Sequence, residues 1–213
     1  MSEVVLHDYW RSSASYRLRI ALNAVELEYE GVPVDILKGE HRRSDYLKLN
    51  PQGLLPTLEV DGERLTQSLA IIEYLAELHP EAHILPADPL GRHRVRALSY
   101  AIAMDIHPIC NSHVAAHVIE LTGRDEARPK WMRRFIGPGL KAFETLLDHP
   151  ATGAFCHGDL PGMADFCLVP QVYNAERWGA DLSGCQRLLE ITERCRALPA
   201  FAAAHPDIVR PAN

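Results

Sequence analysis

The sequence predicts two domains, a small α/β domain followed by an all-helical domain. Short strand-like and helix-like stretches alternate over residues 1–78, whereas strand patterns are absent from residue 91 onward. Residues 79–91, which lie between these regions, contain three prolines and a glycine, as linkers often do. We therefore expect the first domain at 1–83, a linker at 84–91 and the helical domain at 92–213.

A β-α-β unit is predicted at the start of the first domain. Val4–Tyr9 is a short apolar stretch that suits a buried strand. From Leu18 to Val25, apolar residues recur at i, i+3, i+4 and i+7, which is the spacing of the buried stripe of a helix. Val32–Leu37 alternates apolar and polar residues, so we expect the second strand there.

A hairpin and a helix are predicted to complete this domain. An Asp-Gly pair at 61–62 separates the strand-like stretches Leu54–Val60 and Arg64–Leu65, and this pair favours a two-residue hairpin turn. Apolar residues from Ile71 to Leu78 follow the helical spacing, with Ser68 as the expected N-cap. The resulting order, βαβ followed by ββα, is that of a thioredoxin-like domain.

The second domain is predicted from long helical patterns. Gly137-Pro138-Gly139 lies inside one of them and predicts a bend or break, because proline removes a donor and crowds the preceding turn. Before another, Gly162 is expected as an N-cap whose N–H group donates to the Asp165 side chain. The five predicted helices are Arg92–Met104, Ile109–Thr122, Pro129–Leu147, Ala164–Trp178 and Gln186–Ala197.

Composition excludes several classes of function. The chain has 213 residues, of which 47% are hydrophobic and 23% are charged, with 22 basic and 28 acidic side chains and a net charge of −6. This balance argues against binding to nucleic acid or to an anionic membrane surface. We see no apolar run near the roughly 18 residues that span a bilayer, and no secretory signal at the N-terminus.

The cysteines and histidines give little support for a metal site or for disulfides. Five scattered cysteines without a CxxC pair favour reduced thiols and a cytoplasmic protein. Cys110, His113, His117 and Glu120 can share one helix face, but four side chains spread along about 15 Å of helix cannot all reach one ion. We therefore expect no metal.

Four motifs extend across nearly the whole chain. They are RSSASYRLRIAL at 11–22, NP at 50–51 with LPTL at 55–58, TQSLAIIEYL at 66–75 and NAER at 174–177. Together they resemble the zeta-class glutathione transferases of the maleylacetoacetate isomerase family. The resemblance implies the two-domain glutathione transferase architecture, a homodimer, glutathione as cosubstrate and a small dicarboxylate as substrate.

The implied reaction is the cis–trans isomerisation of maleylacetoacetate to fumarylacetoacetate in aromatic amino-acid breakdown. Three alternatives remain: isomerisation of maleylpyruvate, glutathione transfer to small haloacids, and a non-enzymatic binding module with this fold. The last predicts a degraded glutathione site, whereas Ser12, Pro56, Gln67 and Ser68 are all present.

Ser12 and Ser13 lie where a strand ends and a helix begins. Unpaired N–H groups and the positive helix end at such a place stabilise an anion and lower the pKa of a thiol. From the residues alone, helix capping and thiolate binding are both open for Ser12. The resemblance assigns Ser12 to the thiol of glutathione, with Ser13 and Arg11 beside it. Ala14 replaces the cysteine usual in the family, so the reacting thiolate must belong to the ligand.

The resemblance implies further glutathione contacts. A cis peptide at Leu55-Pro56 turns the backbone of Leu55 toward an extended peptide, although most prolines are trans. Gln67 and Ser68 precede a helix and suit a carboxylate. The match of His41 to the family is less specific, and a surface role suits it nearly as well. His107, before Pro108, can act as a hydrogen-bond donor to glutathione or as a general acid. The full expected set is Ser12, Ser13, His41, Gln52, Leu55, Pro56, Gln67, Ser68 and His107.

Arg11 and Arg177 are the expected ligands of the substrate carboxylates, because a guanidinium binds a carboxylate with two hydrogen bonds. The alternative for Arg177 is a surface ion pair with Glu176 or Asp181. Arg17 and Arg19 flank the apolar stripe of their helix, so we expect structural roles for both.

Overall fold

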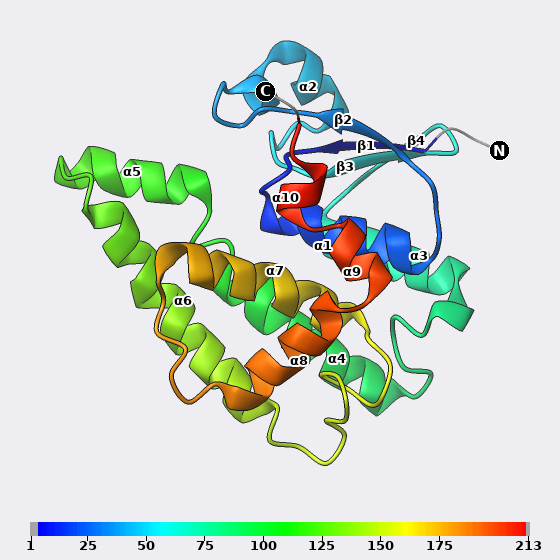
Figure 1. The fold of residues 1–213 in the computed structure, drawn as a ribbon. Helices are drawn as coiled ribbons and strands as arrows, with labels where there is room; N and C mark the ends of the chain where they lie inside the picture. Colours follow the sequence, from blue (N-terminus) through cyan, green and yellow to red (C-terminus); the bar gives the residue numbers. More distant parts are fainter. Residues whose placement is uncertain (1–3, 212–213) are drawn as a thin grey trace. The chain divides into compact units, whose positions relative to one another are not determined.

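The computed structural model describes residues 4–211, which divide into two compact units (Figure 1). The first unit takes in the described residues up to Ile84 and those from Ala197 onward, and the second spans Leu85–Arg196. The first unit, up to Ile84, contains β1 (Val5–Asp8), α1 (Ser13–Ala24), β2 (Glu30–Pro33), η1 (Glu40–Arg42), α2 (Ser44–Leu49), β3 (Thr57–Val60), β4 (Glu63–Thr66), α3 (Ser68–Leu78) and η2 (Pro80–Ala82).

The C-terminal segment carries α9 (Pro199–Ala203) and α10 (Pro206–Val209) and packs within the first unit. The sequence placed this segment in the helical domain, but α9 lies against α1. Arg19 Nε donates to the carbonyl of Ala204 at 3.2 Å, and Asn23 Nδ2 donates to that of Ala200 at 3.0 Å. These side chains therefore fix the C-terminal segment to α1.

The sheet has the strand order β2-β1-β3-β4, in which β1 and β2 are parallel and the other pairs are antiparallel. Thr57, the first residue of β3, is paired with His7 near the end of β1 and with Thr66 at the end of β4. The segments that follow β1, precede β3 and follow β4 therefore meet at one end of the sheet.

Three local expectations can be compared with the structure. The turn at Asp61 and Gly62 has two positive φ angles, 53° and 81°, so the predicted hairpin is confirmed. The second strand lies earlier than predicted, because the Asp35 side chain accepts hydrogen bonds from the N–H groups of Leu37 and Lys38 and forms a turn. Ser68 is the first residue of α3, not its N-cap as predicted.

The second unit consists of helices: α4 (Pro89–Tyr100), η3 (Ala101–Ile106), α5 (Ser112–Thr122), α6 (Ala127–Leu146), α7 (Met163–Trp178) and α8 (Gln186–Arg196). The helix predicted to end at Met104 changes to a π-helix at Ala101, which leads to Pro108. The expected contact at the start of α7 is confirmed, since Gly162 N donates to Asp165 Oδ2 at 2.9 Å.

Helix α6 continues through Pro138, so a break, one of the two predicted outcomes, is wrong, and the bend stays a prediction. A proline inside a helix costs about 3 kcal/mol. Met132, Ile136, Leu140 and Phe143 of the same helix are all buried, and each such side chain contributes roughly 1.5–3 kcal/mol. Tertiary packing therefore outweighs the lost hydrogen bond. Among residues 4–211, no helix is long and apolar enough to cross a membrane.

Candidate active site

Ser12 is the N-cap of α1, and its Oγ accepts a hydrogen bond from Ser15 N at 3.3 Å. Helix geometry leaves the N–H groups of Ser13 and Ala14 without carbonyl partners inside α1. A hydroxyl can accept and donate at the same time. Capping uses the oxygen of Ser12 as an acceptor, so its proton can still be donated to an anion in front of the helix. The two roles weighed for Ser12 are thus compatible.

The segment before β3 is held by two polar side chains of the α2 region. The carbonyl of Leu54 accepts hydrogen bonds from Tyr46 Oη at 2.6 Å and from Asn50 Nδ2 at 2.9 Å. The Leu55–Pro56 peptide that follows is cis, as predicted. Neither Tyr46 nor Asn50 was predicted to have a role, although Asn50 lies inside one of the motifs.

Gln67 forms a hydrogen bond with another expected ligand, Gln52. Its Nε2 donates to Gln52 Oε1 at 2.9 Å, and its backbone has a positive φ of 66°, which few residues other than glycine adopt. Ser68, which follows it, is buried at the start of α3. The backbone of His41, in η1, lies close to Gly53, the neighbour of Gln52, since a Cβ atom on Gly53 would be 3.0 Å from the His41 carbonyl oxygen.

The sheet register brings three of these segments together. Ser12 follows β1, Pro56 precedes β3, and Gln67 follows β4, all at the same end of the sheet. Two of the expected ligands, His107 and Arg177, belong to the second unit. The first unit therefore supplies hydroxyl, amide and helix N–H donors at one place, which is a chemistry suited to an anionic peptide.

Arg11 and Arg177 each lie beside a tryptophan that is their neighbour in the sequence. Their guanidinium carbons are 5.0 Å and 5.5 Å from the ring centroids of Trp10 and Trp178. The carboxylates considered as alternative partners of Arg177 have other ion pairs. Glu176 binds Arg196 at 2.7 Å, and Asp181 binds Lys141 at 2.6 Å.

Arg19 is structural, as expected. Its side chain is buried, forms an ion pair with Asp8, and donates to the carbonyl of Trp10 at 2.9 Å. Burial raises the pKa of Asp8, and the charge and hydrogen bond of Arg19 act in the opposite direction. Arg19 thus fixes the backbone two residues before Ser12.

The cysteines do not offer a reactive thiolate. All five are buried and none of them forms a disulfide, and burial raises the pKa of Cys110 to about 11. Of the four residues weighed as metal ligands, His117 and Glu120 contact each other at 3.1 Å on the surface of α5. Within residues 4–211, no group of three or more His, Cys, Asp or Glu side chains is placed to hold a metal ion.

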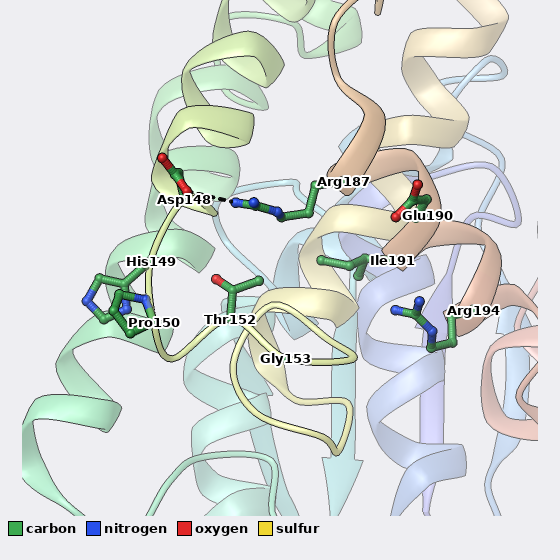
Figure 2. Close-up of a pocket in the computed structure, with 9 residues that line it drawn as sticks. All are labelled: Asp148, His149, Pro150, Thr152, Gly153, Arg187, Glu190, Ile191 and Arg194. Atoms are coloured by element: carbon green, nitrogen blue, oxygen red, sulfur yellow. Dashed lines mark hydrogen bonds and ion pairs between the residues drawn. The ribbon is translucent and has the colours of Figure 1, made fainter.

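A surface hollow of about 450 Å³ lies in the second unit, between α8 and the loop that follows α6 (Figure 2). Two arginines of α8 point toward it, but both bind the loop. Arg187 donates to the carbonyl of Leu147 at 2.8 Å, and Arg194 donates to that of Ala154. We interpret these contacts as anchors of the loop and not as a ligand site.

Comparisons with known proteins agree with this geometry. Residues 2–77 match the glutathione S-transferase N-terminal domain. The chain is 62% identical to maleylacetoacetate isomerase of Rhizobium meliloti (strain 1021), with 99% of each chain covered. It superposes on the holo structure of a bacterial zeta-class maleylpyruvate isomerase with a TM-score of 0.95, at 40% identity over 98% of this chain and 100% of the other.

A third similar protein is maleylacetoacetate isomerase of Methylobacterium extorquens AM1, whose structure contains malonate and glutathione. The TM-score is 0.93 and the identity 38%, with 98% of this chain and 100% of the other covered. High identity over almost the full length, together with the matching fold, settles the family. The chain belongs to the maleylacetoacetate isomerase family of zeta-class glutathione transferases.

Proposed function

We propose that this protein uses glutathione to isomerise maleylacetoacetate to fumarylacetoacetate. The observation that carries the proposal is the position of Ser12, which caps α1 and keeps a hydroxyl proton for an anion at the helix N-terminus. The 62% identity to maleylacetoacetate isomerase of Rhizobium meliloti supports the choice of substrate.

The residues of the first unit suit glutathione as cosubstrate. Glutathione, when bound, would supply a thiolate whose addition to the cis double bond leaves a single bond and moves the negative charge to an enolate of the substrate. Rotation about that bond and expulsion of the same thiolate would give the trans product. We assign to Ser12 and the N–H groups of the first turn of α1 the hydrogen bonds that hold the sulfur in its ionised form. Gln67 and Ser68 hold the γ-glutamyl end at the N-terminus of α3, and Gln52, with His41, lies toward the glycyl end.

Further parts of the proposal rest on the family resemblance. Arg11 and Arg177 bind substrate carboxylates, Ser13 and Leu55-Pro56 contact glutathione, and His107 donates a hydrogen bond to it. The protein acts as a homodimer. Its five cysteines form no disulfide, which supports a reducing compartment, and we propose the cytoplasm.

Replacement of Ser12 tests the proposal. We expect Ser12→Ala to lower kcat/KM for maleylacetoacetate by about 100-fold or more, because a donor to the thiolate is lost. The pKa of glutathione bound to the variant, measured from thiolate absorbance, should rise. Since Ser12 also caps α1, Ser12→Ala should cost about 1 kcal/mol of stability.

Ser12→Gly is the matched control for the capping effect. Glycine is tolerated at an N-cap, so this variant should lose activity as Ser12→Ala does while keeping nearly all its stability. Ser13→Ala should have a smaller effect on activity. Full turnover with an unchanged pH profile in both Ser12 variants would show that the hydroxyl is not used, and absence of isomerase activity in the wild type would reject the function.

Maleylpyruvate is the second candidate substrate, because the similar structure with the TM-score of 0.95 is a maleylpyruvate isomerase. The family resemblance implies that dedicated maleylpyruvate isomerases carry arginines just after a Pro-Ile-x-Asn segment. This chain has Ser112 and His113 after that segment, which spans 108–111. We therefore expect a higher kcat/KM for maleylacetoacetate. Retention on glutathione resin without turnover of either substrate would favour the binding module, and turnover of small haloacids alone would favour the transferase.

A further inference from the structure

Trp10 lies next to two guanidinium groups from distant parts of the sequence. The guanidinium carbon of Arg11 is 5.0 Å from the centroid of the Trp10 ring, and that of Arg210 is also 5.0 Å from it. The two cations are thus no farther apart than the sum of these separations. Both lie beside the segment that leads into Ser12, the N-cap of α1.

The position of Arg210 follows from the packing of the C-terminal segment on α1. Arg19 donates both to the carbonyl of Trp10, at 2.9 Å, and to that of Ala204, at 3.2 Å. The rings of Tyr16 and His205 are in edge contact, with centroids 6.0 Å apart. One buried side chain therefore ties the segment before Ser12 to the segment that carries Arg210, and Arg210 follows α10 directly.

The charges of this pair are not neutralised by the protein. Within residues 4–211, neither Arg11 nor Arg210 forms an ion pair, although the whole chain is acidic with a net charge of −6. Two like charges held near one ring repel each other unless an anion joins them. Stacking on an indole leaves the edge N–H groups of a guanidinium available, and these bind a carboxylate in a planar, two-point arrangement.

We infer that Arg210 is a further specificity-determining residue, which adds a second cation beside Arg11 for the substrate carboxylates at the Ser12 site. The inference rests on the proposed function for the identity of the substrate. It extends the expected pair of arginines, Arg11 and Arg177, by a cation from the C-terminal segment, for which no motif in the sequence gave a signal. The ligand chemistry is a small dicarboxylate.

The test compares Arg210→Gln with wild type at saturating glutathione. We expect the KM for maleylacetoacetate to rise about tenfold, as for loss of one charge-assisted hydrogen bond, and the KM for glutathione to change less than twofold. Arg210→Lys keeps the charge but lacks the planar geometry of a guanidinium. Its KM for maleylacetoacetate should therefore lie between those of wild type and Arg210→Gln. Arg134→Gln is the matched control, because Arg134 is an exposed arginine of α6 and its loss changes the net charge equally.

A second measurement separates the inference from the proposed function. Titration of malonate into the glutathione-loaded protein should give a Kd about tenfold weaker in Arg210→Gln than in wild type and Arg134→Gln. Equal malonate binding and equal KM values would overturn the inference while leaving the function intact, and so would a KM increase for glutathione alone. Weaker malonate binding by the variant, in a protein that does not isomerise maleylacetoacetate, would reject only the function.

Discussion

Arg19→Met removes the buried cation that joins the start of α1 to the C-terminal segment. Arg19 is only 2% exposed and its partner Asp8 is 15% exposed. Methionine fills much of the volume but leaves the Asp8 carboxylate without its partner. The carbonyls of Trp10 and Ala204 also lose a donor. Removing one partner of a buried pair costs about 3–5 kcal/mol, a large part of the 5–15 kcal/mol typical of a folded protein.

The pH dependence of stability tests the role of Arg19 in a second, independent way. Burial raises the pKa of Asp8 and Arg19 lowers it, so the pKa should rise further in Arg19→Met. A carboxyl whose folded pKa lies above its unfolded value costs no stability below the unfolded pKa, and the cost grows as pH rises from there through the folded pKa. The stability deficit of the variant should therefore be largest near pH 7 and should shrink as pH falls toward about 4.

Urea denaturation followed by circular dichroism, at about pH 7 and about pH 5, measures both effects. Asp8→Asn combined with Arg19→Met is the control, because it removes the uncompensated charge and should recover part of the loss. A deficit below about 1 kcal/mol, or one that is the same at both pH values, would refute the reasoning.

Three further predictions concern the second unit. Asp165→Asn should cost about 2 kcal/mol in a denaturant titration, because the buried carboxylate accepts two backbone N–H groups and an amide can accept only with its oxygen. Gly139→Ala should cost about 1–3 kcal/mol, since its Cβ would lie 2.6 Å from Ile106. Gly137→Ala, two residues away, has its nearest neighbour at 3.3 Å and should change stability less. Finally, His113→Arg should raise kcat/KM for maleylpyruvate relative to maleylacetoacetate, and an unchanged ratio would remove the argument for substrate preference.

The order of the main elements could be predicted from the sequence because each has a strong local signal. The hairpin turn at 61–62 and the start of α7 depend on a few neighbouring residues, and both were predicted correctly. The break predicted at Pro138 was wrong, because α6 is stabilised by the burial of its apolar side chains against other helices, which no local pattern shows. The short helices α2, α9 and α10 offer too few turns for a periodic pattern.

The residues of the candidate site also differ in whether the sequence could predict them. Ser12, Leu55-Pro56 and Gln67 lie in motifs, so a resemblance could find them. The contact of Arg210 with Trp10 joins residues 200 positions apart and depends on how the chain returns to α1, which no local pattern contains. The hydrogen bond between Gln52 and Gln67 likewise depends on the sheet register.

The discontinuous first unit also constrains how the protein is made. During translation, the whole of Leu85–Arg196 is synthesised between the two parts of this unit, which takes on the order of ten seconds at typical rates. In that interval Arg19 Nε and Asn23 Nδ2 lack the carbonyls of Ala204 and Ala200. The helical unit, contiguous in sequence, can fold on the ribosome first. The first unit is then completed only when the C-terminal segment, from Ala197 onward, emerges from the ribosome.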